Sequence, residues 1–301
     1  FMYDNSRGTT YFYLEPDSRQ TDIMSAFVQD ELTLIEDRMT LTMGTKFEHN
    51  YYTGLEILPN IRFLFKPYPL NTIWCAISKA VRTPSRVEND AHAIRNVWNF
   101  AGLPLFGQMQ GTKTFRSEEL IAYEIGNRTS FENISYDIAL FYNKYENLRS
   151  YKLGEMLHEP DADNYYVFIP FYLQNRMDGE SFGGELAVKI KPFNWWQFQA
   201  NYTYLKMNMF IPTNGKLNVL DRELNKFAKG TEGESPENQI GLQTTFRFFN
   251  VIDLSINYRW VDEIPQLNVN SYSNLNVHLR YKLSAGISVN ISGHNLLKKH
   301  Y

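Results

Sequence analysis

Apolar and polar residues alternate strictly in the segment around residue 40. The alternating residues are apolar Met39, Leu41, Met43 and Phe47 and polar Thr40, Thr42, Lys46 and Glu48. A period of two places the apolar set on one face of a β-strand and the polar set on the other face. The run is about ten residues long, roughly twice the length of a typical soluble strand. The sequence therefore predicts a long strand with one apolar face and one charged face.

The same alternation recurs along the chain and predicts about thirteen strands. They lie near residues 9–15, 21–35, 38–50, 57–67, 71–82, 118–129, 133–148, 166–191, 195–206, 236–249, 251–262, 271–283 and 285–296. The segment 117–127 contains residues that favour a helix, but its place in the series favours a strand. The strand at 166–191 is unusually long, and we expect bulges near its glycines, Gly179, Gly183 and Gly184.

The connections between these strands alternate between short and long. The short ones lie at 35–38, 67–71, 129–133, 191–194, 248–251 and 283–286, and the long ones at 50–57, 83–117, 149–165, 207–236 and 263–271. Two of the long links, 83–117 and 207–236, exceed the roughly 12–15 residues usual in a compact domain, which predicts that they are functional or disordered. Within the first of them, residues 90–98 fit a short helix.

Two architectures are compatible with repeated alternation. A soluble β-sandwich favours short strands with turns at both ends. An outer-membrane barrel has strands of about ten residues, short turns on one side and long loops on the other. The sequence has the second pattern and predicts an all-β fold, a transmembrane antiparallel up-and-down β-barrel. In such a barrel Met39, Leu41, Met43 and Phe47 contact lipid. The sheet is closed because lipid offers no water to bond unpaired backbone groups.

Composition agrees with this fold and narrows the function. The chain has 301 residues, 43% of them hydrophobic, and no run of eighteen apolar residues that would form a membrane-spanning helix. Aromatic residues make up 15%, which suits the aromatic girdles of a barrel. The net charge of −3 gives no indication of nucleic-acid binding. Cys75 is the only cysteine, so neither a disulfide framework nor a cysteine zinc site is expected.

Five segments, taken in order, resemble the TonB-dependent receptors of Gram-negative outer membranes. They are SAFVQDELTLIEDRMTLTMGTKFE, WCAISKAVRTPSRVE, FRSEELIAYEIGNR with Glu118, Glu124 and Gly126 at the family spacing, SFGGELAVKIKPFNWWQFQANYTYL, and ISGHNLLKKHY. In the last segment Lys298 stands where an acidic residue is common in the family. Each motif alone has low specificity, whereas their order over nearly the whole chain is specific.

The resemblance implies a 22-stranded barrel closed by an N-terminal plug that imports a scarce ligand, typically a ferric siderophore. It also implies two partners besides the ligand, the TonB complex of the inner membrane and outer-membrane lipid. Residues 1–301 then represent a partial barrel of about thirteen strands, with the plug and the last strand absent from the sequence. We expect a location in the cell outer membrane and no cofactor.

Eight residues are candidates for ligand contact at strand mouths and in the outer loops. They are Arg82, Arg86, His92, Trp98, Phe100, Phe106, Met209 and Phe210. Guanidinium groups pair well with oxygen-rich anionic chelates, and apolar groups in long loops often mark binding surfaces. Each also has a structural alternative: a turn anchor or charge network for the arginines, a solvated residue for the histidine, and packing between loops for the others. Lumen charges such as Glu124 and Arg259 fit pairing with one another or with a plug.

Other functions remain as alternatives. A passive porin or fatty-acid channel has the same wall but lacks a plug, and a soluble all-β binding protein has a similar alternation. The six histidines form no compact metal pattern, and no nucleophile and base occur in a recognisable constellation. The resemblance implies a binding and transport protein, and the lack of such a constellation counts against an enzyme.

Overall fold

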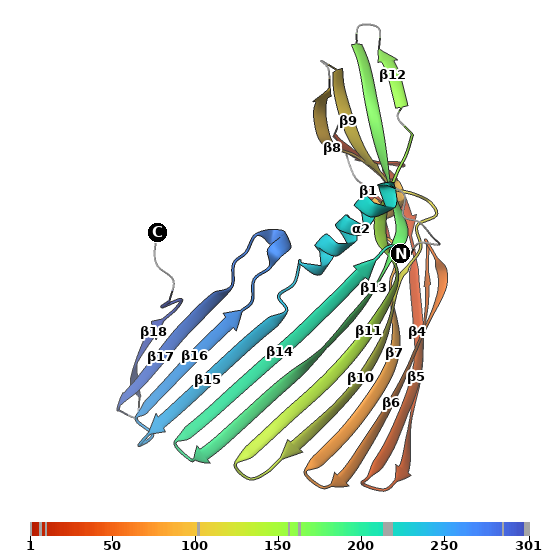
Figure 1. Cartoon of the computed structure of the whole chain (residues 1–301). Coiled ribbons are helices and arrows are strands. Elements are labelled where there is room, and N and C mark those ends of the chain that lie inside the picture. The colour runs from red at the N-terminus through yellow and green to blue at the C-terminus, as the bar shows by residue number, and fades with distance from the viewer. Residues whose placement is uncertain are drawn as a thin grey trace.

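Twelve long strands, here called the wall, form a tilted antiparallel sheet (Figure 1). The computed structural model describes residues 2–5, 8–9, 11–100, 103–155, 157–161, 164–212, 219–284 and 286–297. The wall strands are β4 (Ile23–Ile35), β5 (Met39–Asn50), β6 (Gly54–Tyr68), β7 (Asn71–Arg82), β10 (Glu118–Ser130), β11 (Ile134–Leu153), β13 (Asn164–Phe193), β14 (Trp196–Phe210), β15 (Asn238–Phe248), β16 (Ile252–Val261), β17 (Tyr272–Ser284) and β18 (Ile287–Gly293). Within the described residues β4 and β18 are the two edges, so the wall is an open, partial barrel.

The predicted series of long strands is confirmed, including β10 at the segment with helical propensity. Several strands extend beyond their predicted ends on the side of the long links, as in β11 and β14. The expected bulge next to Gly179 is present as a shift of register between β11 and β13. Pairing of β13 with β14 continues through Gly183 and Gly184 without interruption, so the bulges expected there are absent.

Strand register assigns the residues of the wall to two faces. Thr42 pairs with Arg62, Arg62 with Ala76, and Ala76 with Glu124. Directly paired residues share a face, so this row defines a polar face, and residues of the opposite parity define an apolar face. Apolar-face side chains are widely exposed, with 52% for Ile77 and 55% for Leu140. This arrangement confirms the predicted alternation, and it suits a wall with lipid on one side.

The apolar face is bounded by aromatic rings at the short turns and by ion pairs toward the long links. Near the turn between β13 and β14, five rings stack with centroids 5.2–6.5 Å apart: Phe193, Trp195, Trp196, Phe246 and Phe248. At the opposite border Lys79 pairs with Glu119, and Lys144 with Glu146, both at 2.6 Å. The apolar band between these borders matches the girdled band of membrane barrels.

Above the wall stands a smaller sheet, here called the head, made of β2 (Phe12–Leu14), β8 (Ala91–Phe100), β9 (Leu103–Gln110), β12 (Leu157–Asp161) and the upper part of β13 (Figure 1). β9 pairs with β13 in parallel, unlike the antiparallel wall. The predicted first strand at 9–15 belongs here, as β2, and not to the wall. One side of the head is packed, with a core of Leu14, Ala91, Ala93, Met109, Phe115 and Leu173.

The helix expected at residues 90–98 is wrong. Helix α1 covers only Arg86–Asp90, and the chain then enters β8, which bonds to both β2 and β9. Pairing with two strands and burial of Ala91 and Ala93 outweigh the local helical preference. The long link 83–117 is therefore largely ordered β structure.

Short elements complete the fold. β1 (Met2–Asn5) pairs with β3 (Ser18–Thr21), and the 3-10 helix η1 covers Pro265–Leu267. Helix α2 (Val219–Glu232) lies against the end of β14, where the Met209 amide donates to Glu232 Oε1 at 2.7 Å. No helix in the described ranges is long and apolar enough to cross a membrane.

Candidate functional site

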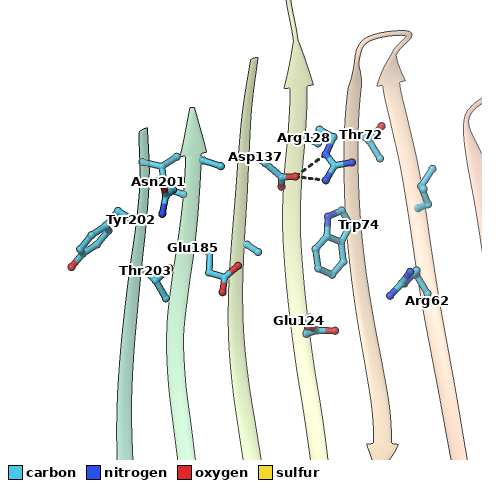
Figure 2. Close-up of a pocket in the computed structure, with 14 residues that line it drawn as sticks. Arg62, Thr72, Trp74, Glu124, Arg128, Asp137, Glu185, Asn201, Tyr202 and Thr203 are labelled. Carbon is cyan, nitrogen blue, oxygen red and sulfur yellow. Dashed lines mark hydrogen bonds and ion pairs between the residues drawn. The ribbon is translucent and has the colours of Figure 1, made fainter. Parts of the chain in front are cut away.

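The polar face contains a hollow of about 790 Å³ that extends over six wall strands, β6, β7, β10, β11, β13 and β14 (Figure 2). It is lined by Arg62, Leu64, Thr72, Trp74, Glu124, Arg128, Asp137, Ala139, Glu185, Leu186, Ala187, Asn201, Tyr202 and Thr203. Most of these side chains have polar-face parity, whereas the Tyr202 ring points away from the other labelled residues. The hollow is thus a charged, hydrogen-bonding surface on the inner side of a partial barrel.

Two contacts fix the basic side chains of the hollow. Arg128 Nε donates to Asp137 Oδ2 at 2.7 Å across β10 and β11. Arg62 lies over the Trp74 ring, 5.9 Å from its centroid. The indole in turn covers Gly126, where a Cβ would come within 2.5 Å of the ring. Trp74 therefore takes the space that a side chain at position 126 would fill.

Two carboxylates of the hollow lack such partners. In the part of the chain that the structure describes, Glu124 and Glu185 make no side-chain hydrogen bond or ion pair, although both line the hollow. Figure 2 shows them on the same side of the wall as Trp74. They leave the hollow with negative charge that is open to a basic group of a partner.

A second polar centre, here called the junction, lies where the head meets the wall. Its centre is Asp90, whose side chain has no exposed surface. Arg19 donates to Asp90 through Nε at 2.7 Å and through Nη2 at 2.9 Å, and Arg86 donates through Nε at 3.4 Å. Lys113 adds a further ion pair. One buried carboxylate thereby connects β3, α1 and the segment that follows β9.

Glu88 forms the other half of the junction. Its side chain is 2% exposed and accepts bonds from the Ser85 amide at 2.7 Å and from Arg82 at 2.7 Å. Arg149 lies 3.6 Å away. Burial acts to raise the pKa of Glu88, but the hydrogen bonds from Arg82 and Ser85 outweigh it, so the pKa lies below the ordinary value of 4.5.

The lowered pKa of Glu88 predicts loss of junction stability in acid. A carboxyl group whose pKa is lower in the folded state stabilises that state at a pH above its pKa in the unfolded chain. The contribution disappears as the pH falls through the pKa of the folded state. We expect the protection of α1 amides, relative to their intrinsic exchange rate at each pH, to fall below pH 4.5. Glu88→Gln is expected to lower the protection free energy of these amides by about 1–3 kcal/mol already at pH 7, and to flatten its dependence on pH. Hydrogen exchange from pH 7 to 3 measures both effects, and an unchanged profile in the variant would contradict this role.

The junction includes both predicted arginines. Arg86 is buried, and its donors contact Asp4, Asp90 and the Pro16 carbonyl. Arg82 is 45% exposed and bonds to Glu118 and Glu88, both at 2.7 Å. Their geometry corresponds to the structural alternative of an anchor. Ligand contact by either residue stays a prediction.

Two other candidates share one face of the head. His92 stacks on Tyr13 with centroids 4.8 Å apart, and its Nε2 lies 3.6 Å from Glu15. Phe106 stacks on Phe168 at 5.3 Å. β-strand pairing places both on the face opposite the packed core. The side chains of Trp98 and Phe100 lie outside the described part of the structure.

The remaining candidates lie apart from this group, at the end of β14. Met209 is buried against Met177 and Ile211, whereas Phe210 is 37% exposed. The structure therefore divides the eight candidates among the junction, the head and the end of β14. Sequence reasoning missed Arg19, Asp90 and Lys113, because residues distant in sequence carry no local signal of their pairing. Strand parity placed Asp137 and Thr203 opposite the apolar residues, but it did not indicate that they line one hollow with Glu124.

Within the described residues, no group of three or more His, Cys, Asp or Glu side chains has the geometry to hold a metal ion. The chain therefore offers hydrogen bonds, charges and aromatic surfaces as its chemistry.

Comparisons with known proteins agree with this architecture. The family model described as TonB dependent receptor-like, beta-barrel, matches residues 2–296. The siderophore receptor PirA from Acinetobacter baumannii is similar in structure, with a TM-score of 0.73 at 17% identity over 94% of this chain and 42% of that one. A ferric enterobactin receptor mutant (PfeA) from Pseudomonas aeruginosa, solved with enterobactin, gives a TM-score of 0.73 at 16% identity over 94% and 41%. The siderophore receptor PirA from Pseudomonas aeruginosa gives 0.66 at 14% identity over 94% and 46%.

A comparison with curated proteins found no match. The chain spans less than half the length of the solved receptors that it resembles.

Proposed function

Because this chain belongs to the TonB-dependent receptor-like β-barrel family, we propose that it is part of an outer-membrane receptor that imports a scarce ligand with energy delivered through TonB. The observation that carries the proposal is the division of the wall into an exposed apolar face and a charged polar face. The apolar face contacts outer-membrane lipid, and the polar face lines the interior. In this proposal the receptor is a binding and transport protein and not an enzyme.

The proposed cargo is a ferric siderophore. Solved structures similar to this chain are named as siderophore receptors, and one holds enterobactin. Such chelates present oxygen-rich anionic and aromatic groups, which suit a surface with His92, Phe106 and the exposed part of Arg82. Trp98, Phe100 and Phe210 remain further proposed contacts. The buried positions of Arg86 and Met209 favour a supporting role for these two residues.

We propose that the polar-face hollow contacts the plug of the complete receptor. Arg128 and Asp137 neutralise each other, and Arg62 lies on Trp74. Glu124 and Glu185 are carboxylates without an ion pair among the described residues, and they suit arginine or lysine side chains of a plug. Wall strands that pair with β4 and β18 would complete the barrel in the same receptor.

Energy-dependent uptake tests the proposed function. The full-length receptor is produced in an outer membrane that lacks its own siderophore receptors, and uptake of radiolabelled ferric catecholate and hydroxamate chelates is followed. We expect saturable uptake of one class, abolished by a protonophore or by removal of TonB. Uptake that is indifferent to both treatments would instead support a passive porin or fatty-acid channel.

The two free carboxylates give a separate prediction for the plug. Glu124→Gln with Glu185→Gln converts two charge-assisted bonds to neutral ones at a cost of about 1 kcal/mol each, so displacement of the plug becomes at least tenfold more frequent. We expect greater sensitivity of the cells to large antibiotics that the outer membrane normally excludes. Glu48→Gln is the control, because Glu48 pairs with Lys46 on the same face at 2.6 Å. Equal sensitivity in both variants would argue against a plug contact at this hollow.

A further inference from the structure

The apolar face has a hollow of its own, of about 570 Å³. Six side chains of apolar-face parity surround it, Ile138 and Leu140 from β11, Phe182 and Leu186 from β13, and Tyr202 and Tyr204 from β14. It exists because Gly184 has no side chain on this face, whereas every other residue of that parity from 182 to 190 has one. We call this feature the outer groove.

The chemistry of the outer groove is that of a hydrocarbon site. Its surrounding side chains are aliphatic or aromatic and remain exposed, with 55% for Leu140, 47% for Phe182 and 39% for Tyr202. Phe182 and Tyr204 meet edge to face, with centroids 6.5 Å apart, and form one rigid side. An apolar depression gives an acyl chain more van der Waals contacts than a flat strand surface does, and these contacts decide the preference because lipid tails are as apolar as the groove.

The position of the outer groove selects one leaflet of the membrane. Along β11, the apolar-face residues run Ile134, Tyr136, Ile138, Leu140 and Tyr142, and the next one is Lys144, which pairs with Glu146. On β14, Lys206 follows Tyr204 on the same face and pairs with Glu237. The groove thus ends directly below the charged border on the side of the long links. It lies in the upper half of the apolar band, at the depth of acyl chains in the outer leaflet.

We propose that the outer groove is a lipid-binding site that holds one acyl chain of an outer-leaflet lipid. The chain lies between Phe182 and Leu140, whose Cδ2 leans over Gly184 to within 2.8 Å of the place that a Cβ would take there. The lipid headgroup then meets the ion-paired Lys144 and Lys206 at the border. The proposal rests on the proposed function only in placing the wall in a membrane.

Native mass spectrometry of the full-length receptor, extracted from outer membranes in a mild detergent, tests this site. We expect the unaltered receptor to retain one lipid. Phe182→Ala with Leu186→Ala is expected to lower the retained fraction severalfold, since the truncated side chains lose most of their van der Waals contacts with the acyl chain. Gly184→Leu, which fills the groove from within, is expected to lower it as well.

Matched substitutions outside the groove control for general loss of lipid contact. Leu254→Ala with Ile256→Ala removes two apolar-face side chains on β16 and is expected to leave retention unchanged. The proposal would be overturned by equal retention in all variants or by absence of lipid from the unaltered receptor. It would also be overturned if the retained molecule were a second protein and not a lipid. Insertion of the unaltered receptor into lipid vesicles is measured separately. Failure of insertion would count against the membrane placement, and failure of retention alone against the groove.

Discussion

Replacement of Asp90 by alanine is expected to destabilise the head by about 3–5 kcal/mol, the cost of breaking a buried ion pair from one side. Arg19, with 14% of its side chain exposed, would then keep its charge without a carboxylate, and Arg86, with 6%, would keep only the more exposed Asp4. Because Asp90 joins segments from both sides of α1, the whole head is expected to open more often. Hydrogen exchange and limited proteolysis of the link 83–117 in the full-length receptor measure this opening.

Asp137→Ala is the matched control for this effect. Asp137 also pairs with an arginine, but its side chain is 32% exposed and that of Arg128 is 70% exposed. Exposed pairs contribute about 0.2–1 kcal/mol, so this variant is expected to leave the head unchanged. Similar protection of the head in Asp90→Ala and Asp137→Ala would show that the junction does not hold the head in place.

Replacement of Ile256 by arginine is expected to destabilise the wall by about 2–4 kcal/mol, the cost of a cation on the lipid face near the membrane midplane. Ile256 has apolar-face parity in the middle of β16, where it pairs with Thr244 and Val277. An arginine at this depth loses its hydration. Unfolding of the full-length receptor from lipid vesicles by guanidinium measures the difference.

The adjacent residue provides the control. Asn257 pairs with Gln243 and Asn276 on the polar face, so Asn257→Arg places the same charge on the same strand but toward the interior. Polar-face substitution is expected to change the free energy of unfolding by less than about 1 kcal/mol. An equal loss of stability in both variants would contradict the assignment of the two faces to lipid and interior.

The two predictions concern parts of the receptor that differ in local stability. The wall is held by continuous strand pairing, with uninterrupted registers such as that of β10 with β11. The head depends on a small core and on one charged junction. Binding loops often belong to the less stable parts of a protein, and opening of the head is compatible with ligand capture.

The long strands were predictable from the sequence because their information is local. A residue such as Thr42 differs from Met43 in polarity, and the pleat of a strand converts that difference directly into opposite faces. The short turns followed for the same reason, since a break in the alternation marks where the chain reverses. The family resemblance came from motifs within these strands and was confirmed by the family match.

The head was mispredicted where distant segments decide the local conformation. Residues 90–98 favour a helix by themselves, but β2 and β9 offer two sets of backbone hydrogen bonds to β8. The parallel pair of β9 and β13 joins residues about sixty positions apart. The periodicity within each of these two segments carries no information about which strand it pairs with, so the alternation pattern could not predict this pairing.

For the candidate ligand residues, too, local sequence showed their position along the chain but not their surroundings in the fold. That arginines occur near the end of β7 is plain in the sequence. Arg86 is buried against Asp90, whereas Arg82 stays partly exposed. This difference depends on the tertiary structure, which brings Arg19 and Lys113 from other segments to Asp90. Alternation along the chain thus determined the wall and its two faces, and motifs within the strands indicated its family. Only the tertiary structure decided the junction, the head and both hollows, because burial and charge pairing depend on which distant segments meet.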